Sequence, residues 1–275
     1  MSYISKDVIL NGSYQVIDMV NMGYYCVIFS ALDLKSNTTA AVKNLKCEGE
    51  GDLKAEYDNL MLLAPFNYSP TPLAFGAVPD EISFYVLSME GQSLFELKAN
   101  NNSNKFSEVT TSLLLFHSLV ALKSIHEAGI VHGDVTVMNI GVPKSLGKGR
   151  IIYYDFGCSI PINPISCSRD ISNLLMVTGL VSKENRTLSE CRDAFENEPS
   201  TTMETLIEMV SKETIRTAEP GNEESDESDK DDEEEPEEDN EPEDEEPTVR
   251  CYTLRSRTVE PEERMEPEEA PGARG

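Results

Sequence analysis

The spacing of apolar residues changes along the chain, and this change constrains the fold more than any other feature. The first part holds three short apolar runs, YQVIDMV, YYCVIF and TTAAVKNL, which polar or glycine-containing turns separate. Such runs predict an antiparallel meander of strands. Residues 107–129 instead repeat apolar side chains at helical spacing and end at Gly129, a residue type favoured just after a helix. We therefore predict an α+β fold, with a β-rich region first and a mostly helical region after it.

The other segments follow one of these two periodicities. Residues 53–64 have helical spacing, and Asp52 in front of them is a suitable N-cap. The remaining predicted elements are a strand over residues 82–89, a short helix from Ser93, and helices over residues 170–182 and about 201–216. These two last helices are expected to complete the ordered part of the chain.

Acidic residues are concentrated near the C-terminus. The formal net charge is −27, and residues 218–247 hold 19 acidic side chains against one basic side chain. This segment has too few apolar groups to offset the entropy lost on ordering, so we predict a disordered acidic tail over residues 218–275. Three interpretations of the tail stay open: loose solvation, docking of basic proteins, and autoinhibition by mimicry of an acidic substrate. No basic stripe stands elsewhere in the chain, which argues against nucleic acid as a direct ligand.

The sequence also bears on the compartment. Its first residues lack the pattern of a signal peptide, and we expect no stretch that approaches the roughly 20 apolar residues needed to span a bilayer. The six cysteines are scattered, with no CxxC pair and no histidine at ligand spacing, which predicts reduced thiols. We therefore expect no membrane association and a cytoplasmic or nuclear location.

Two short motifs carry the chemistry, HGDVTVMN at residues 132–139 and YYDFG at residues 153–157. They place Asp134, Asn139 and Asp155 on two loops about twenty residues apart. Phosphoryl transfer from a metal-bound nucleotide needs a carboxylate beside the attacking hydroxyl and hard oxygen ligands for Mg²⁺. The two motifs resemble the catalytic loop and the D-F-G metal loop of the protein-kinase superfamily.

The resemblance implies a role for each matching residue. Asp134 matches the catalytic base, Asn139 the second-metal ligand and Asp155 the principal Mg²⁺ ligand. Lys43 in AAVK matches the strand lysine that contacts the nucleotide phosphates, and Glu56 matches its ion-pair partner. The implied cofactors are ATP and Mg²⁺.

The segments expected to cover the nucleotide match less completely. Aligned on the family's glycine-rich hairpin, residues 21–31 keep one of three glycines, Gly23, and place Asn21 and Cys26 at the other two positions. Glycines let backbone N–H groups approach phosphate closely, so this hairpin predicts a stiffer cover and weaker ATP affinity. Tyr25 is expected to cap the phosphates. The segment YVLSMEGQSL resembles the family's hinge, with backbone groups for adenine expected at Ser88, Met89 and Glu90.

Departures from the family pattern point to a compact, atypical member. Gly133 stands where most regulated kinases have Arg, and Thr136 where serine/threonine kinases have a phosphate-contacting Lys. Only residues 158–169 separate the D-F-G motif from Asp170, which resembles the buried aspartate that opens the central helix of the second lobe. The motifs resemble those of casein-kinase-one and vaccinia-related kinases and of the small KEOPS-complex kinase. Activity is expected not to depend on phosphorylation of the short segment.

The resemblance implies a two-lobed fold and leaves two functional hypotheses. The expected parts are an N-lobe over residues 1–90, a shortened C-lobe over residues 91–217 and the acidic tail. The first hypothesis is an active serine/threonine-type protein kinase or kinase-like ATPase, since every group that handles Mg·ATP is present. The alternative is a pseudokinase that binds nucleotide or docks proteins. We expect a protein substrate, with basic proteins as candidates because of the acidic tail. We also expect a monomer or a member of a complex.

Overall fold

The computed structural model describes residues 4–23, 25–45, 52–78, 82–101, 103–143, 151–198 and 200–218. These residues belong to one compact unit, residues 1–224. The predicted acidic tail lies outside the described residues from residue 219 onward, as do Cys47 and Cys251. The tail interpretations therefore stay predictions.

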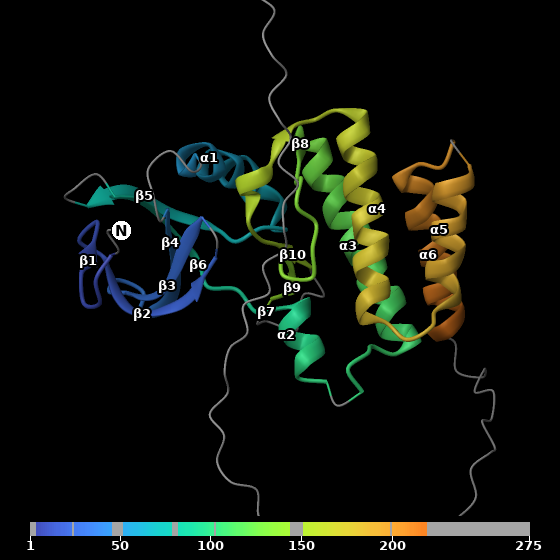
Figure 1. The fold of residues 1–275 in the computed structure, drawn as a ribbon, viewed down its shortest axis with the longest axis horizontal. Helices are drawn as coiled ribbons and strands as arrows, with labels where there is room; N and C mark the ends of the chain where they lie inside the picture. Colours follow the sequence, from blue (N-terminus) through green and yellow to red (C-terminus); the bar gives the residue numbers. More distant parts are fainter. Residues whose placement is uncertain are drawn as a thin grey trace, which may run out of the picture. The chain divides into compact units, whose positions relative to one another are not determined.

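A six-stranded antiparallel sheet, with strand order β1-β2-β3-β4-β6-β5, forms the N-terminal region (Figure 1). Its strands are β1 (Ile9–Leu10), β2 (Tyr14–Met22), β3 (Cys26–Asp33), β4 (Thr38–Leu45), β5 (Pro72–Val78) and β6 (Ile82–Ser88). The three predicted strands of the meander are confirmed as β2, β3 and β4. Side chains alternate along β3, so that Val27, Phe29 and Ala31 are buried on one face of the sheet while their neighbours face the other side.

Helix α1 (Leu53–Leu63) joins this sheet to the rest of the protein. Asp52 caps it as predicted, because its side chain accepts a hydrogen bond of 2.9 Å from the amide of Ala55. Leu53, Leu60 and Leu63 are buried in the same apolar cluster as residues of the helical region. The placement of α1 is therefore fixed from both regions.

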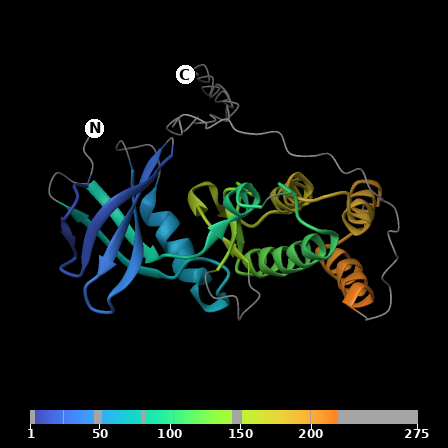
Figure 2. The ribbon, with the colours of Figure 1, turned by 90° about the horizontal axis from the view of Figure 1, so that it is seen from below.

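The C-terminal region is mostly helical, and α3 and α4 pack side by side in it (Figures 1 and 2). Its helices are α2 (Leu94–Ala99), α3 (Glu108–Glu127), α4 (Pro164–Val181), α5 (Arg186–Asn197) and α6 (Met203–Ala218). Its short strands and 3-10 turn are β7 (Gln92–Ser93), β8 (Ile130–Val131), β9 (Ile140–Val142), β10 (Ile152–Tyr153), η3 (Phe156–Cys158) and β11 (Ile160–Pro161). A further 3-10 turn, η1 (Ala64–Phe66), follows α1. Ser93 and Ser107 cap α2 and α3, because the side chain of each accepts a backbone amide, and the predicted Gly129 follows α3 with a φ of +86°.

By length and composition, α3 is apolar enough to cross a membrane, so the expectation that no stretch approaches this limit is wrong. Its 20 residues form a central helix of the protein, and 56% of its most apolar 18-residue window is buried. It packs against α4, α5 and α6. Burial against these helices accounts for its apolar composition.

Two helices differ from the prediction. Helix α4 begins at Pro164, six residues before the predicted start at Asp170, because Asn163 caps it by accepting a 2.9 Å hydrogen bond from the amide of Ser166. The predicted segment 158–169 is therefore helical in its second half. Helix α5 was not predicted, because its polar and charged composition hides the apolar pattern of its two buried apolar side chains, Leu188 and Cys191, beside the buried Thr187.

Candidate active site

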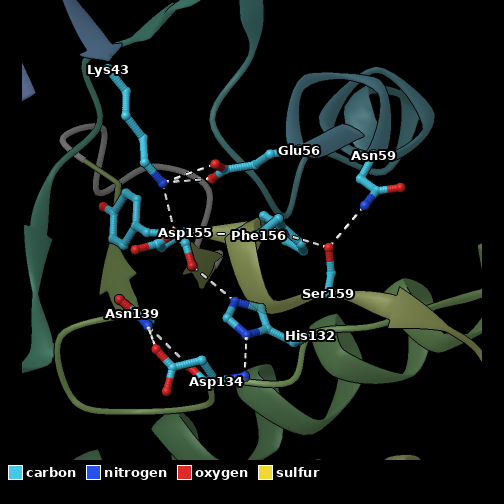
Figure 3. A network of polar contacts seen from close by, with 11 residues as sticks. Lys43, Glu56, Asn59, His132, Asp134, Asn139, Asp155, Phe156 and Ser159 are labelled. Carbon is cyan, nitrogen blue, oxygen red and sulfur yellow. Dashed lines mark hydrogen bonds and ion pairs between the residues drawn. The ribbon is translucent and has the colours of Figure 1, made fainter. Parts of the chain in front are cut away.

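The lysine and the two acidic residues that the sequence singled out lie together. Nζ of Lys43, on β4, is 2.9 Å from both carboxylate oxygens of Glu56, on α1, and 2.7 Å from Oδ1 of Asp155 (Figure 3). Lys43 is 8% exposed and Glu56 is 4% exposed. A buried charge is costly unless it is paired, so each of these groups stabilises the others in this arrangement.

The pKa shifts of the three groups follow from burial and mutual attraction. Burial alone would lower the pKa of Lys43, but Tyr85 together with the carboxylates of Glu56 and Asp155 outweighs it and holds the pKa well above its usual value. For Asp155, burial opposes ionisation, but the charge and hydrogen bond of Lys43 together with the amide of Gly157 outweigh it, and the pKa is lowered. Burial raises the pKa of Glu56 despite the neighbouring Lys43. Lys43 therefore stays charged at neutral pH.

Tyr85 completes this buried group, although the sequence analysis did not identify it. It lies directly opposite Lys43 in the pairing of β4 with β6, and its ring centroid is 5.9 Å from Nζ of Lys43. Its hydroxyl interacts with the carboxylate of Glu56. Burial raises the pKa of Tyr85 well above its usual value, so its hydroxyl is neutral beside Glu56. Strand register, which the sequence does not specify, brings it there.

Asp134 and Asn139, the two candidate site residues of the HGDVTVMN motif, are also held together. Nδ2 of Asn139 donates to the carbonyl oxygen of Asp134 at 3.0 Å and to its carboxylate Oδ2 at 2.7 Å. The backbone N–H of Asn139 donates to the carbonyl oxygen of Thr136 at 3.1 Å. This small loop therefore fixes the Asp134 carboxylate through its own backbone and one amide side chain.

His132 links the two motifs. Its Nε2 is 2.8 Å from the carbonyl oxygen of Tyr154, and its Nδ1 is 3.2 Å from the amide nitrogen of Asp134. The carbonyl requires a proton on Nε2 and the amide requires a lone pair on Nδ1, so the ring is neutral. Burial lowers the pKa of His132 in agreement with this assignment. The ring also lies 4.7 Å, centroid to centroid, from Phe156.

Asp170, a buried aspartate on α4, anchors the first residues of the HGDVTVMN motif through its carboxylate. Its Oδ2 accepts the amide of His132 at 2.8 Å, and its Oδ1 accepts the amide of Gly133 at 3.1 Å. Nε2 of His126 lies 3.1 Å from Oδ2. With 1% exposure, Asp170 has its charge compensated by these donors rather than by water.

Gly133 occupies a position that admits no side chain. Its φ is +81°, and a Cβ placed there would lie 2.3 Å from the carbonyl oxygen of Cys158. An arginine at this position, which most regulated kinases have, would therefore clash with the turn that follows Asp155. The glycine allows the loop of residues 132–139 and this turn to lie in direct contact.

A cavity of about 440 Å³ opens beside these groups. The predicted site residues that line it are Gly23, Lys43, Glu56, Ser88, Met89, Glu90, Asn139 and Asp155. Asp134 is connected to the cavity through its hydrogen bond to Asn139. Tyr25 is 48% exposed and is not among the lining residues, so its phosphate-capping role stays a prediction.

Tyr154, another residue that the sequence analysis missed, shapes the wall of this cavity. Gly141 lies against it: a Cβ on Gly141 would be 2.5 Å from Cε2 of the Tyr154 ring and 2.6 Å from the carbonyl oxygen of Gln92. Burial raises the pKa of Tyr154, and the carboxylates of Glu90 and Glu96 add to this effect. The cavity therefore offers an uncharged aromatic ring as one surface.

Hard oxygen atoms are available for a magnesium ion. Asp155 uses Oδ1 to accept from Lys43 and from the amide of Gly157, and Asn139 uses Nδ2 to bind Asp134. Asp155 Oδ2 and Asn139 Oδ1 fit the requirement of Mg²⁺, which takes one or two protein ligands and completes its shell with phosphates and water. Carboxylates of Glu56, Glu90, Glu96 and Asp155 line the cavity against one cation, Lys43, among its described lining residues. A bare polyphosphate would be repelled there.

Comparison with known proteins agrees with this geometry. The chain is 25% identical over 166 residues to MAP3K epsilon protein kinase 2 of Arabidopsis thaliana, covering 59% of this chain and 12% of that protein. It is 30% identical over 147 residues to casein kinase I homolog 1 of Schizosaccharomyces pombe, covering 52% of this chain and 32% of that protein. These relatives are protein kinases. For serine/threonine-protein kinase pakH of Dictyostelium discoideum the identity is 25% over 149 residues, or 54% of this chain and 28% of that protein.

The similarity is thus to protein kinases in general and covers a little more than half of this chain. The chain spans between 12% and 32% of the length of these relatives. No protein-family model matches it. The comparisons support a kinase-like transferase, and the substrate and partners are matters for proposal.

Proposed function

We propose that the protein is a compact serine/threonine-type protein kinase that transfers the γ-phosphoryl group of Mg·ATP, with a two-lobed kinase fold. One observation carries the proposal: Lys43, Glu56 and Asp155 form one ion-paired group in the same cavity as Asn139, and Asn139 holds Asp134. Folding alone does not require this set of charged groups, of which Lys43 and Glu56 are buried, since a buried charge is costly unless it has a role or a partner.

Each group has a distinct task in the proposed reaction. The ammonium of Lys43 binds the α- and β-phosphates, and Glu56 keeps it in place. Asp155 and Asn139 would hold Mg²⁺, which neutralises phosphate charge when bound. Asp134 orients the attacking hydroxyl and accepts its proton as the new oxygen–phosphorus bond forms, while the bond from the γ-phosphorus to the bridging oxygen breaks and ADP departs.

A second candidate is a pseudokinase that binds nucleotide and docks partner proteins without transfer. The observation that favours it is the hairpin of β2 and β3, where only Gly23 remains of the three expected glycines. Thr136 in place of a phosphate-contacting lysine points the same way. Nucleotide binding alone does not distinguish the candidates, so transfer has to be measured.

The test combines calorimetric titration of Mg·ATP with phosphate transfer to casein and to a basic protein. Asp155→Asn should weaken Mg·ATP binding by more than about a hundredfold, since losing even an outer partner of a metal ligand costs about 10–100-fold. Asp134→Asn should keep the affinity within about threefold and lower transfer by about a hundredfold or more. Asp58→Asn, an exposed acidic residue of α1, is the matched control.

The outcomes separate the two candidates. Unchanged Mg·ATP binding by Asp155→Asn would remove Asp155 from the metal site. Wild-type protein that binds Mg·ATP but transfers no phosphate to itself or to either substrate would favour the pseudokinase.

We further propose that the acidic tail selects basic protein substrates or partners. The proposal rests on its 19 acidic side chains between residues 218 and 247, because opposite charges accelerate association at low ionic strength. We also propose that the protein is located in the cytoplasm or the nucleus. We propose that it is a monomer or a subunit of a complex. Truncation after residue 217 should slow association with a basic protein at low salt and leave the melting transition cooperative.

A further inference from the structure

The segment that follows Asp155 is short and is attached to the protein at several points. β11 pairs with β8, with Ile160 opposite Val131. The amide of Ile162 donates to the carbonyl oxygen of Gly129 at 2.9 Å. These contacts fix the C-terminal half of the segment to the strand that leads into His132.

The N-terminal half of the segment is attached to helix α1 through side chains. Nδ2 of Asn59 donates to Oγ of Ser159 at 2.8 Å, and the same hydroxyl donates to the carbonyl oxygen of Phe156 at 2.5 Å (Figure 3). Asn59 and Ser159 are a hundred residues apart in the sequence and both are half-buried. One hydroxyl therefore joins α1 to the turn η3.

This bridge lies one helical turn from Glu56. Residues three apart on a helix share a face, so Asn59 and Glu56 both face the segment of residues 155–159. Glu56 is within the ion-paired group of Lys43 and Asp155, and a Cβ on Gly157 would lie 3.5 Å from its Oε2. A rotation or shift of α1 that broke the Asn59 contact would also move Glu56 away from Lys43.

We propose that Asn59 and Ser159 are positioning residues, which hold α1 so that Glu56 keeps Lys43 ready for the phosphates. The inference rests on the proposed nucleotide site and adds the device that assembles it. Gly133, which lacks the guanidinium that pairs a phosphorylated loop, is in direct contact with this same turn at Cys158. The neutral hydroxyl bridge takes the place of a phosphate-dependent contact, and a phosphate on Ser159 would break it.

Two measurements test the proposal, the first without nucleotide. A double-mutant cycle compares Asn59→Ala, Ser159→Ala and the double variant by chemical denaturation. If the bridge exists, the double variant unfolds no more easily than the less stable single variant. Fully additive losses of stability would overturn the bridge, whether or not the protein binds nucleotide.

The second measurement is the Mg·ATP dissociation constant, well below the melting temperature of each variant. Ser159→Ala and Asn59→Ala should each raise it about three- to tenfold, the range expected for loss of one hydrogen bond. Ser159→Thr, which keeps the hydroxyl, should restore it to within about twofold, and Ser159→Glu should weaken binding most. Ser168→Ala, on exposed α4 surface, is the matched control.

The pattern of results distinguishes the failures. An unchanged dissociation constant in Ser159→Ala, with a normal wild-type value, would show that the bridge is only structural and would overturn the positioning role. Wild-type protein that does not bind Mg·ATP would contradict the proposed function, while the double-mutant cycle would still decide the bridge.

Discussion

The two walls of the cavity differ in how firmly their backbone is held. On one side, β2 is exposed from residue 17 to residue 22, and its pairing with β3 shifts register twice, after Val16 and after Met19. On the other side, the loop of residues 132–139 is tied to Asp170, to Tyr154 and to its own side chains. The proposed catalytic groups lie on the well-anchored wall, and the expected nucleotide cover lies on the exposed one. Catalytic groups must be held closely in place relative to the reacting atoms, whereas the segment that covers the nucleotide can move without losing its role.

The largest expected effect comes from removing the anchor of the loop. Asp170→Ala leaves the buried amide of His132 and the amide of Gly133 without acceptors, so we expect a loss of about 3 to 5 kcal/mol in the free energy of unfolding. Chemical denaturation measures it. Asp193→Ala, which removes an exposed carboxylate from α5, should cost less than about 0.5 kcal/mol. Equal losses in the two variants would show that the loop does not depend on Asp170.

A pair of glycine substitutions compares the two walls directly. Gly133→Ala introduces a Cβ at positive φ, 2.3 Å from the carbonyl oxygen of Cys158, and should cost about 2 to 4 kcal/mol. Gly23→Ala, whose Cβ would lie 3.4 Å from Sγ of Cys26, should change stability by less than about 0.5 kcal/mol. The difference between their melting temperatures is the measurement. If Gly23→Ala were the more damaging variant, the order of rigidity would be the reverse.

The pH dependence of stability depends on His132. Burial lowers the pKa of His132 in the folded protein below 6.5, its value in the unfolded chain. Between these two pKa values the unfolded chain binds a proton at His132 that the folded chain does not. The free energy of unfolding should therefore fall as pH drops below 6.5, by up to about 1.4 kcal/mol per pH unit.

His132→Asn should remove most of this slope in denaturation curves at pH 5.0 to 7.0. His117, on α3, also has a pKa lowered by burial but is only half-buried, so His117→Asn should remove less of the slope. A slope unchanged in His132→Asn would show that another group controls it.

The smallest effect is expected on the exposed wall. Asn21→Gly restores a glycine of the expected cover and should tighten Mg·ATP binding about two- to threefold, because backbone N–H groups could approach phosphate more closely. The same change should cost about 0.5 to 1 kcal/mol of stability, since glycine loses more conformational freedom in a strand. Titration calorimetry checks the affinity. Weaker binding in Asn21→Gly would mean that the asparagine itself contacts the nucleotide.

The sequence alone determined the order of elements and the main polar residues. Periodicity predicted β2, β3, β4, α1 and α3, and the cap Asp52 was found because capping is a local interaction between neighbouring residues. The motifs predicted the residues that the structure brings together around Lys43 and Asp134. Their chemical roles stay proposals that the variants above test.

Tertiary structure alone decided the contacts between distant segments. Strand register set Tyr85 opposite Lys43, and packing joined Asn59 to Ser159 across a hundred residues. The burial of α5 also depended on neighbours that no local pattern encodes, whereas the early start of α4 has a local cause, the Asn163 cap before Pro164. Gly133 could be seen as unusual in the sequence, but the reason for it, the carbonyl group of Cys158 beside its Cα, exists only in the folded chain. Such contacts depend on side-chain packing and backbone geometry in three dimensions, which sequence spacing does not record.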